Sequence, residues 1–259
     1  MHADIEAFLR GNARTITASL CLQMLGAGAT ATILCGSAFV QSGQPAVELP
    51  ADAERFAVGE RLVLNGLPMR VDGFISRSSP ERLLSWFRTR LGSPLVENTL
   101  GKARILGRAQ GDHYLTVRIE PAGDGSRGLV ATTDLKAAYD SREQAQSASA
   151  RLLARMLPGS QLLSEQTSVD AGKLSRHVVV VNGYGEEPNR TRVEAMLRED
   201  GLSLERAPEP AQREGTAGRQ GRTLYFRSAG KEAIATIFRD HRGHTVTVLN
   251  SISHMEQFR

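Results

Sequence analysis

Cysteine is nearly absent from this sequence of 259 residues, and lysine is scarce. The cysteines are Cys21 and Cys35, so the chain after residue 35 has no disulfide, no thiol nucleophile and no thiolate ligand for a metal. The lysines are Lys102, Lys136, Lys173 and Lys231. A domain without disulfides must fold by burying a core of sufficient size. The bias towards arginine and the missing disulfides together indicate a bacterial protein.

A strong excess of charge is also missing. The net charge is +4 over the whole chain, although the sequence pI is about 9.4. The sequence contains no aromatic RNA-binding motif and no zinc-finger spacing, so we expect no nucleic-acid partner. We interpret the arginines at 82, 88 and 90 as one exposed helix face.

Signatures of catalysis are absent as well. The sequence contains no Gly-x-Ser-x-Gly elbow and no His-Glu-x-x-His motif. The candidate metal ligands are His241 and His244, but they fall on an expected hairpin tip and have no evident third ligand. We therefore expect an ordinary polar turn there, and no catalytic residue, cofactor or metal elsewhere.

The longest feature present is a charge-free run at residues 15–47, which follows Arg10 and Arg14. Segment 15–40 is long enough to cross a hydrocarbon core of about 30 Å as a helix. Basic residues before it are typical of a signal peptide, here with cleavage near Ala38, and of a membrane anchor whose N-terminus stays inside. Both interpretations place the rest of the chain in the periplasm. A buried helix of a soluble domain is the third alternative.

Short sequence matches recur at a spacing of roughly 110 residues, which indicates a tandem duplication. The matching pairs are 71–74 (VDGF) with 181–184 (VNGY), Pro80 with Pro188, and 114–119 with 233–238. Each unit is predicted to contain a hairpin, a helix and three further strands. In the first unit the strands are expected at 60–65, 69–75, 103–107, 114–120 and 129–133, with a helix from Pro80 to Gly92. In the second they are expected at 161–169, 177–182, 202–206, 223–228 with 233–239, and 245–249, with a helix from Pro188 to Gly201. The segments 223–228 and 233–239 are counted either as one strand or as two.

The sequence therefore predicts an α+β fold with two tandem duplicated β-β-α-β-β-β units, each an antiparallel sheet with one packed helix. The expected divisions are an N-terminal flank (1–14), the signal or anchor segment (15–40), a linker (41–48), the first unit (49–138), a connecting helix (139–157) and the second unit (158–259). The Asx-Gly pairs at 72–73 and 182–183 are interpreted as a duplicated structural feature.

This plan favours a non-catalytic envelope protein that is an accessory or structural component of a periplasmic assembly, such as a secretion or pilus apparatus. The expected partners are other envelope proteins, and the membrane if 15–40 is not cleaved. Trp86, with Arg82 and Arg90 on the same predicted helix, is the candidate contact surface. The alternatives are a soluble periplasmic ligand-binding module and a hydrolase.

Overall fold

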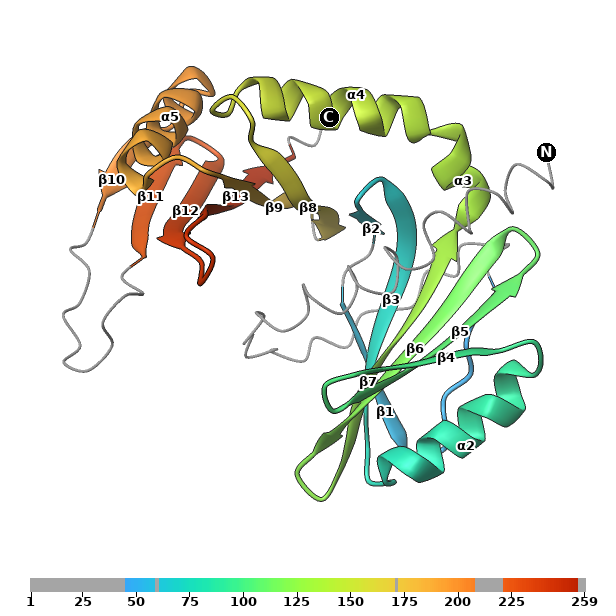
Figure 1. The fold of residues 1–259 in the computed structure, drawn as a ribbon. Coiled ribbons are helices and arrows are strands. Elements are labelled where there is room, and N and C mark those ends of the chain that lie inside the picture. The colour runs from blue at the N-terminus through green and yellow to red at the C-terminus, as the bar shows by residue number, and fades with distance from the viewer. Residues whose placement is uncertain (1–44, 59–60, 171, 208–220, 256–259) are drawn as a thin grey trace. The chain divides into compact units, whose positions relative to one another are not determined.

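The computed structural model describes residues 45–58, 61–170, 172–207 and 221–255. The expected signal or anchor segment, 15–40, lies outside these residues. Within the described part of the chain, no helix has both the length and the apolar character needed to cross a membrane. The same residues form mostly antiparallel β-sheet with four helices, an arrangement of the α+β type (Figure 1).

The chain divides into two compact units. The first comprises the described residues up to Leu62 together with Leu67–Asp140. The second comprises Val63–Gly66 and the described residues from Ser141 onward.

The first unit is an antiparallel sheet with one long helix. Its elements are β1 (Ala53–Ala57), β2 (Arg61–Leu64, whose last two residues fall in the second unit), β3 (Leu67–Ser76), α2 (Pro80–Leu91), β4 (Val96–Leu100), β5 (Ala103–Gln110), β6 (His113–Ala122), β7 (Gly125–Asp134) and α3 (Leu135–Asp140). The strand order is β2-β3-β7-β6-β5-β4, and β1 also pairs with β3. Helix α2 packs on β5 and β6 (Figure 1).

Local signals explain why α2 forms where it does. Ser79 is the N-cap, and its hydroxyl accepts a hydrogen bond from the Arg82 N–H at 3.4 Å. Pro80 occupies the first helical position, where its fixed φ suits a helix, and Gly92 ends the helix with φ 71°. The buried face of α2 meets the sheet in one apolar cluster. That cluster contains Val47, Phe74, Leu83, Leu84, Phe87, Leu91, Leu106, Leu115, Val117, Ile119 and Val130.

Glycines set the turns between the last four strands of the first unit. Gly101, Gly111 and Gly123 have φ values of 57°, 57° and 56°, and each is the first residue of a two-residue hairpin turn. A positive φ at that position is the requirement of a type II′ turn, whose twist matches that of the strands. Short turns of this kind fix the register of β4 to β7.

The second unit also contains a hairpin, a helix and four strands in the order found from β2 to β7, preceded by a helix. Its elements are α4 (Arg142–Ala154), β8 (Gln161–Asp170), β9 (Lys173–Asn182), α5 (Glu186–Glu199), β10 (Ser203–Arg206), β11 (Arg222–Ser228), β12 (Lys231–Arg239) and β13 (Thr245–His254). The strand order is β8-β9-β13-β12-β11-β10, the same as in the first unit. Helix α5 packs on β10, β12 and β13. The buried cluster includes Val178, Val180, Val193, Met196, Leu197, Leu224, Phe226, Ala235 and Ile237.

The structure corrects three details of the predicted plan. Four strands, not three, follow the helix in the first unit, and the omitted strand is β4; in the second unit the segments expected at 223–228 and 233–239 are two strands, β11 and β12. Strand β1 was also not predicted. The Asx-Gly pairs do not correspond, because Asp72 lies within β3 opposite Val130, whereas Asn182 is the last residue of β9, opposite Thr245.

Candidate functional site

The predicted contact residues lie in one row along α2, at positions i, i+4 and i+8. Trp86 is half-buried against the core of its own unit and meets Phe87 edge-on, with ring centroids 4.9 Å apart. The Arg90 guanidinium lies 5.7 Å from the Trp86 ring centroid and pairs with Glu48 at 2.5 Å. Arg82 is exposed on the same row. The contacts of Trp86 and Arg90 given above lie within the first unit and do not show a partner. Partner binding by this row therefore stays a prediction.

The two candidate metal ligands lie in the turn between β12 and β13. Asp240 organises this turn, because its Oδ1 accepts the N–H groups of Arg242 and His244 at 2.8 and 2.9 Å. The His244 Nδ1 lies 3.6 Å from Asp240 Oδ2. His241 is exposed. Among the described residues, no three or more His, Cys, Asp or Glu side chains are grouped so that they could hold a metal ion.

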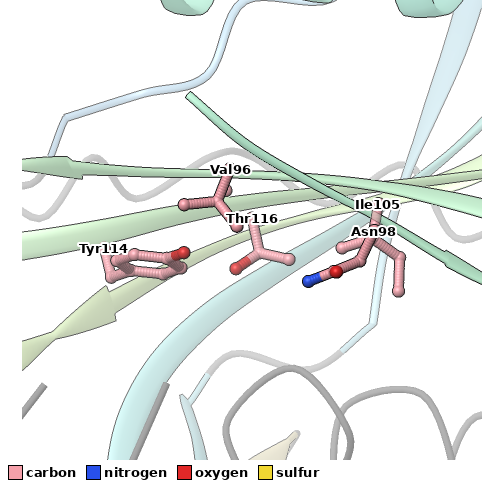
Figure 2. A pocket seen from close by; sticks show the side chains of 6 residues that line it. Val96, Asn98, Ile105, Tyr114 and Thr116 are labelled. Carbon is pink, nitrogen blue, oxygen red and sulfur yellow. The ribbon is translucent and has the colours of Figure 1, made fainter. Parts of the chain in front are cut away.

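A shallow hollow lies on the first unit, on the sheet face opposite α2, which we call the rear face. Its lining residues come from three adjacent strands, β4, β5 and β6, and their side chains are shown in Figure 2. They are Val96, Asn98, Ile105, Gly107, Tyr114 and Thr116. The empty volume of about 180 Å³ includes space open to solvent, and no space for a water molecule is enclosed. The hollow is therefore a shallow depression and not a cavity for a cofactor.

Gly107 makes the shape of this hollow. A Cβ at this position would lie 2.3 Å from the Tyr114 hydroxyl oxygen, so only glycine lets the phenol lie over β5. Burial raises the pKa of the Tyr114 hydroxyl. The phenol is thus neutral at physiological pH and available as a hydrogen-bond donor.

We expect Tyr114 to ionise above pH 10, the ordinary range of tyrosine. Its folded pKa exceeds its unfolded value, so the stability that the neutral phenol contributes is complete below about pH 10 and is lost as the pH rises through the folded pKa. The measurement is an ultraviolet absorbance titration of the wild type and of Tyr114→Phe. The ionisation step that the wild type shows and Tyr114→Phe lacks belongs to Tyr114, and it should lie above pH 10. A Tyr114 step at or below pH 10 would contradict the burial of this group.

Three buried polar atoms on the rear face of the first unit have no hydrogen-bond partner. They are Thr116 Oγ1, Arg118 Nε and Thr133 Oγ1. The residues are only 5%, 8% and 0% exposed, respectively. Arg118 still donates from Nη2 to Glu120 at 2.8 Å. A buried group without a partner costs about 1–3 kcal/mol, and a fourth such atom of this unit, Arg108 Nε, lies on the face that carries α2.

Thr116→Val tests that cost. Valine keeps the shape of threonine and removes the orphan hydroxyl, so we expect the free energy of unfolding to rise by about 1 kcal/mol. Thr116→Ser is the matched control, since it keeps the hydroxyl, loses a methyl group and should lower stability by about 1 kcal/mol. Urea unfolding followed by the fluorescence of the single tryptophan measures both changes. A less stable valine variant would show that the hydroxyl has a partner.

The hollow borders an exposed sheet edge, which sequence reasoning did not identify. All five residues of β4 are exposed, with Val96 and Leu100 at 54% and 44%. Within the described residues, β4 pairs only with β5. Glu97 anchors β4 to α2 through two hydrogen bonds from Arg88, at 2.6 and 2.7 Å, and the same contacts hold the pKa of the Glu97 carboxyl below its usual range.

A polar cluster fixes the end of β3, just before α2. The Ser76 hydroxyl accepts the Ser78 N–H at 3.0 Å and donates to Asp52 at 2.6 Å. The Ser126 hydroxyl donates to the Ser78 carbonyl at 2.8 Å, and Ser126 lies opposite Ser76 in the sheet. Hydrogen bonds from the Ser76 and Ser78 hydroxyls hold the pKa of Asp52 below its ordinary value.

The second unit has a matching cluster at the end of β9, just before α5. The Asn182 side-chain oxygen accepts the Tyr184 N–H at 3.0 Å. The Thr245 hydroxyl donates to the Tyr184 carbonyl at 2.6 Å, and Thr245 lies opposite Asn182 in the sheet. Asn182 also exchanges two hydrogen bonds with the buried Asn189, at 2.7 and 3.0 Å, and donates to Ser160 at 3.1 Å. These groups are mutually satisfied, which is the pattern of a structural network.

The candidate site among the described residues is therefore the β4 edge with its hollow. Comparison with protein-family models, with curated proteins and with solved structures found no match to this chain.

Proposed function

We propose that this chain is a non-catalytic bacterial envelope protein, an accessory or structural component of a periplasmic assembly such as a secretion or pilus apparatus. The observation that carries the proposal is the exposed edge of the first sheet, where Val96 and Leu100 present apolar side chains to solvent. Unpaired strand edges pair readily with other chains, and proteins normally protect them. An apolar edge left exposed is therefore a natural contact surface.

The proposed cellular location rests on residues 15–40. We propose that they either anchor the chain in the inner membrane, with the N-terminus inside, or are removed by cleavage near Ala38. The charge-free run and the preceding Arg10 and Arg14 support this. The ligand-binding and hydrolase alternatives gain no support from the hollow, since it is a shallow depression that encloses no space for a ligand.

We also propose that the two units arose by tandem duplication. Both have a hairpin, a helix and four strands, with the same strand order in the sheet. Both also join the strand end to the helix start by the same pair of hydrogen bonds, through Ser76 and Ser126 in one unit and Asn182 and Thr245 in the other. This shared detail supports common descent more strongly than strand order alone.

The proposed location is tested by fractionating cells and measuring the intact mass of the chain. Full-length chain in the membrane fraction, or chain beginning near residue 39 in the periplasmic fraction, is the expected result. Ala27→Arg places a charge near the centre of 15–40, where it opposes insertion by about 2.5–3.5 kcal/mol, and should remove an anchored chain from the membrane. Ala7→Arg, in the flank, is the matched control. Unprocessed wild-type chain confined to the cytosol would overturn the proposal.

A further inference from the structure

We propose that strand β4 binds an extended segment of a partner protein as an additional strand of the first sheet. This inference rests on the proposed function, because it names how the chain would contact its assembly. The partner segment is defined by chemistry: it is extended, it has apolar residues at alternate positions, and it lacks proline at the paired positions.

The backbone of β4 leaves two residues free to accept such a strand. Leu100 and Ala103 close the two-residue turn at Gly101, so they form a hydrogen-bonded pair. Bonded and non-bonded pairs alternate along an antiparallel ladder. Glu97 and Thr99 therefore direct their backbone N–H and C=O groups away from β5. These are the groups to which a partner strand would bond.

The side chains of β4 define what the partner must present. The register places Val96, Asn98 and Leu100 on the rear face, in rows with Gly107, Ile105 and Ala103. Val96 and Leu100 are 54% and 44% exposed, so neighbouring side chains on an added strand would cover apolar surface on this face. Apolar residues at every second position of the partner satisfy that pattern, because side chains on one face of a strand have a period of two.

The hollow behind β4 lies next to this edge, and Val96 and Asn98 are among its lining residues (Figure 2). It is a shallow depression that does not enclose space for a water molecule, so it does not admit a partner side chain. The side chains of an added strand would instead lie over the exposed Val96 and Leu100.

The edge is also ordered in advance. The two hydrogen bonds from Arg88 to Glu97 hold β4 against α2, on the face opposite the hollow. A preformed edge lowers the ordering cost of binding. A second copy of this chain is a less suitable occupant, because two five-residue strands span only about 17 Å and bury far less than the ~1,200 Å² of a stable dimer.

Thr99 offers a test that leaves the β4–β5 ladder intact. Thr99→Pro removes the outward N–H and is compatible with an edge strand, whereas Thr99→Ala removes the side chain and keeps the N–H. The probe is a fluorescent ten-residue peptide that alternates valine and threonine between terminal lysines, with a proline-substituted peptide as its control. Binding to the full-length chain in detergent is measured by fluorescence anisotropy.

We expect saturable binding to the wild type and to Thr99→Ala, and at least a tenfold weaker affinity for Thr99→Pro. Val96→Lys should weaken binding similarly, and the tryptophan unfolding curves confirm that each variant is folded. Equal binding to the proline and alanine variants, or no binding to the wild type, overturns the inference. So does sedimentation showing a dimer that Thr99→Pro abolishes, because the occupant is then a second copy. These results do not depend on the fractionation experiment. Strand binding at β4 and location in the envelope can therefore each be refuted without refuting the other.

Discussion

Phe87→Ala should unfold the first unit under conditions in which the wild type is folded. Phe87 is completely buried, and its ring lies 5.7 Å from that of Phe74 and 4.9 Å from that of Trp86. Truncating such a ring removes buried apolar area and leaves a cavity, at a cost of about 3–5 kcal/mol. Small domains have total stabilities near the low end of 5–15 kcal/mol, so little would remain.

Urea unfolding followed by tryptophan fluorescence measures this loss, because Trp86 is the single tryptophan and touches Phe87 directly. Phe87→Leu is the matched control, since it keeps most of the volume and should cost less than about 1.5 kcal/mol. Alanine and leucine variants of equal stability would contradict the packing of α2 on the sheet. Trp86→Ala should cost less than Phe87→Ala, because Trp86 is only half-buried; this variant has no tryptophan, so its unfolding is followed by circular dichroism.

Helix α2 shows how much of the fold the sequence predicts. Its beginning at Pro80, its apolar face and its end at Gly92 follow from capping residues and helical spacing, and all three agree with the structure. Strand β6 is likewise predicted within two residues at each end, and β13 begins at the predicted residue but extends five residues beyond the predicted end. In these segments local propensity and burial favour the same conformation.

The predicted repeat alignment shows where such reasoning stops. It matches 114 with 233, but Tyr114 lies on the rear face of its sheet, while Ala233 is buried among the residues that pack with α5. The alignment is therefore out by one residue at this strand. A shift of one residue exchanges the two faces of a strand, and a weak sequence match cannot detect it. Register depends on partners distant in sequence.

The candidate site was missed for a related reason. Strand β4 has no buried residue and follows Ser93–Pro94, so neither burial nor alternation marks it as a strand. Its pairing with β5 defines it, through the two-residue turn at Gly101. The turn at Gly101 was the available signal. A glycine that closely precedes a predicted strand indicates a hairpin turn, and a hairpin turn requires another strand before it.

The buried asparagines of the second unit give the remaining large prediction. Asn182 and Asn189 are 4% and 1% exposed and exchange two hydrogen bonds. The proposed duplication matches them with Ser76 and Leu83, since each pair has the same spacing from its helix N-cap, Gly185 or Ser79. The first unit thus has a hydroxyl and an apolar side chain where the second has two amides.

We expect Asn182→Ser and Asn189→Leu each to cost about 2–3 kcal/mol, because each leaves part of the other amide buried without a partner. The double variant should cost less than the sum by about 1–3 kcal/mol, since it adopts the combination already present in the first unit. Circular dichroism measures the unfolding of the second unit, and an unchanged tryptophan transition is the internal control. Additive costs would show that the two sites are uncoupled. They would also remove the support that this asparagine pair gives to matching Asn182 with Ser76 and Asn189 with Leu83, because the two positions would then be exchangeable one at a time.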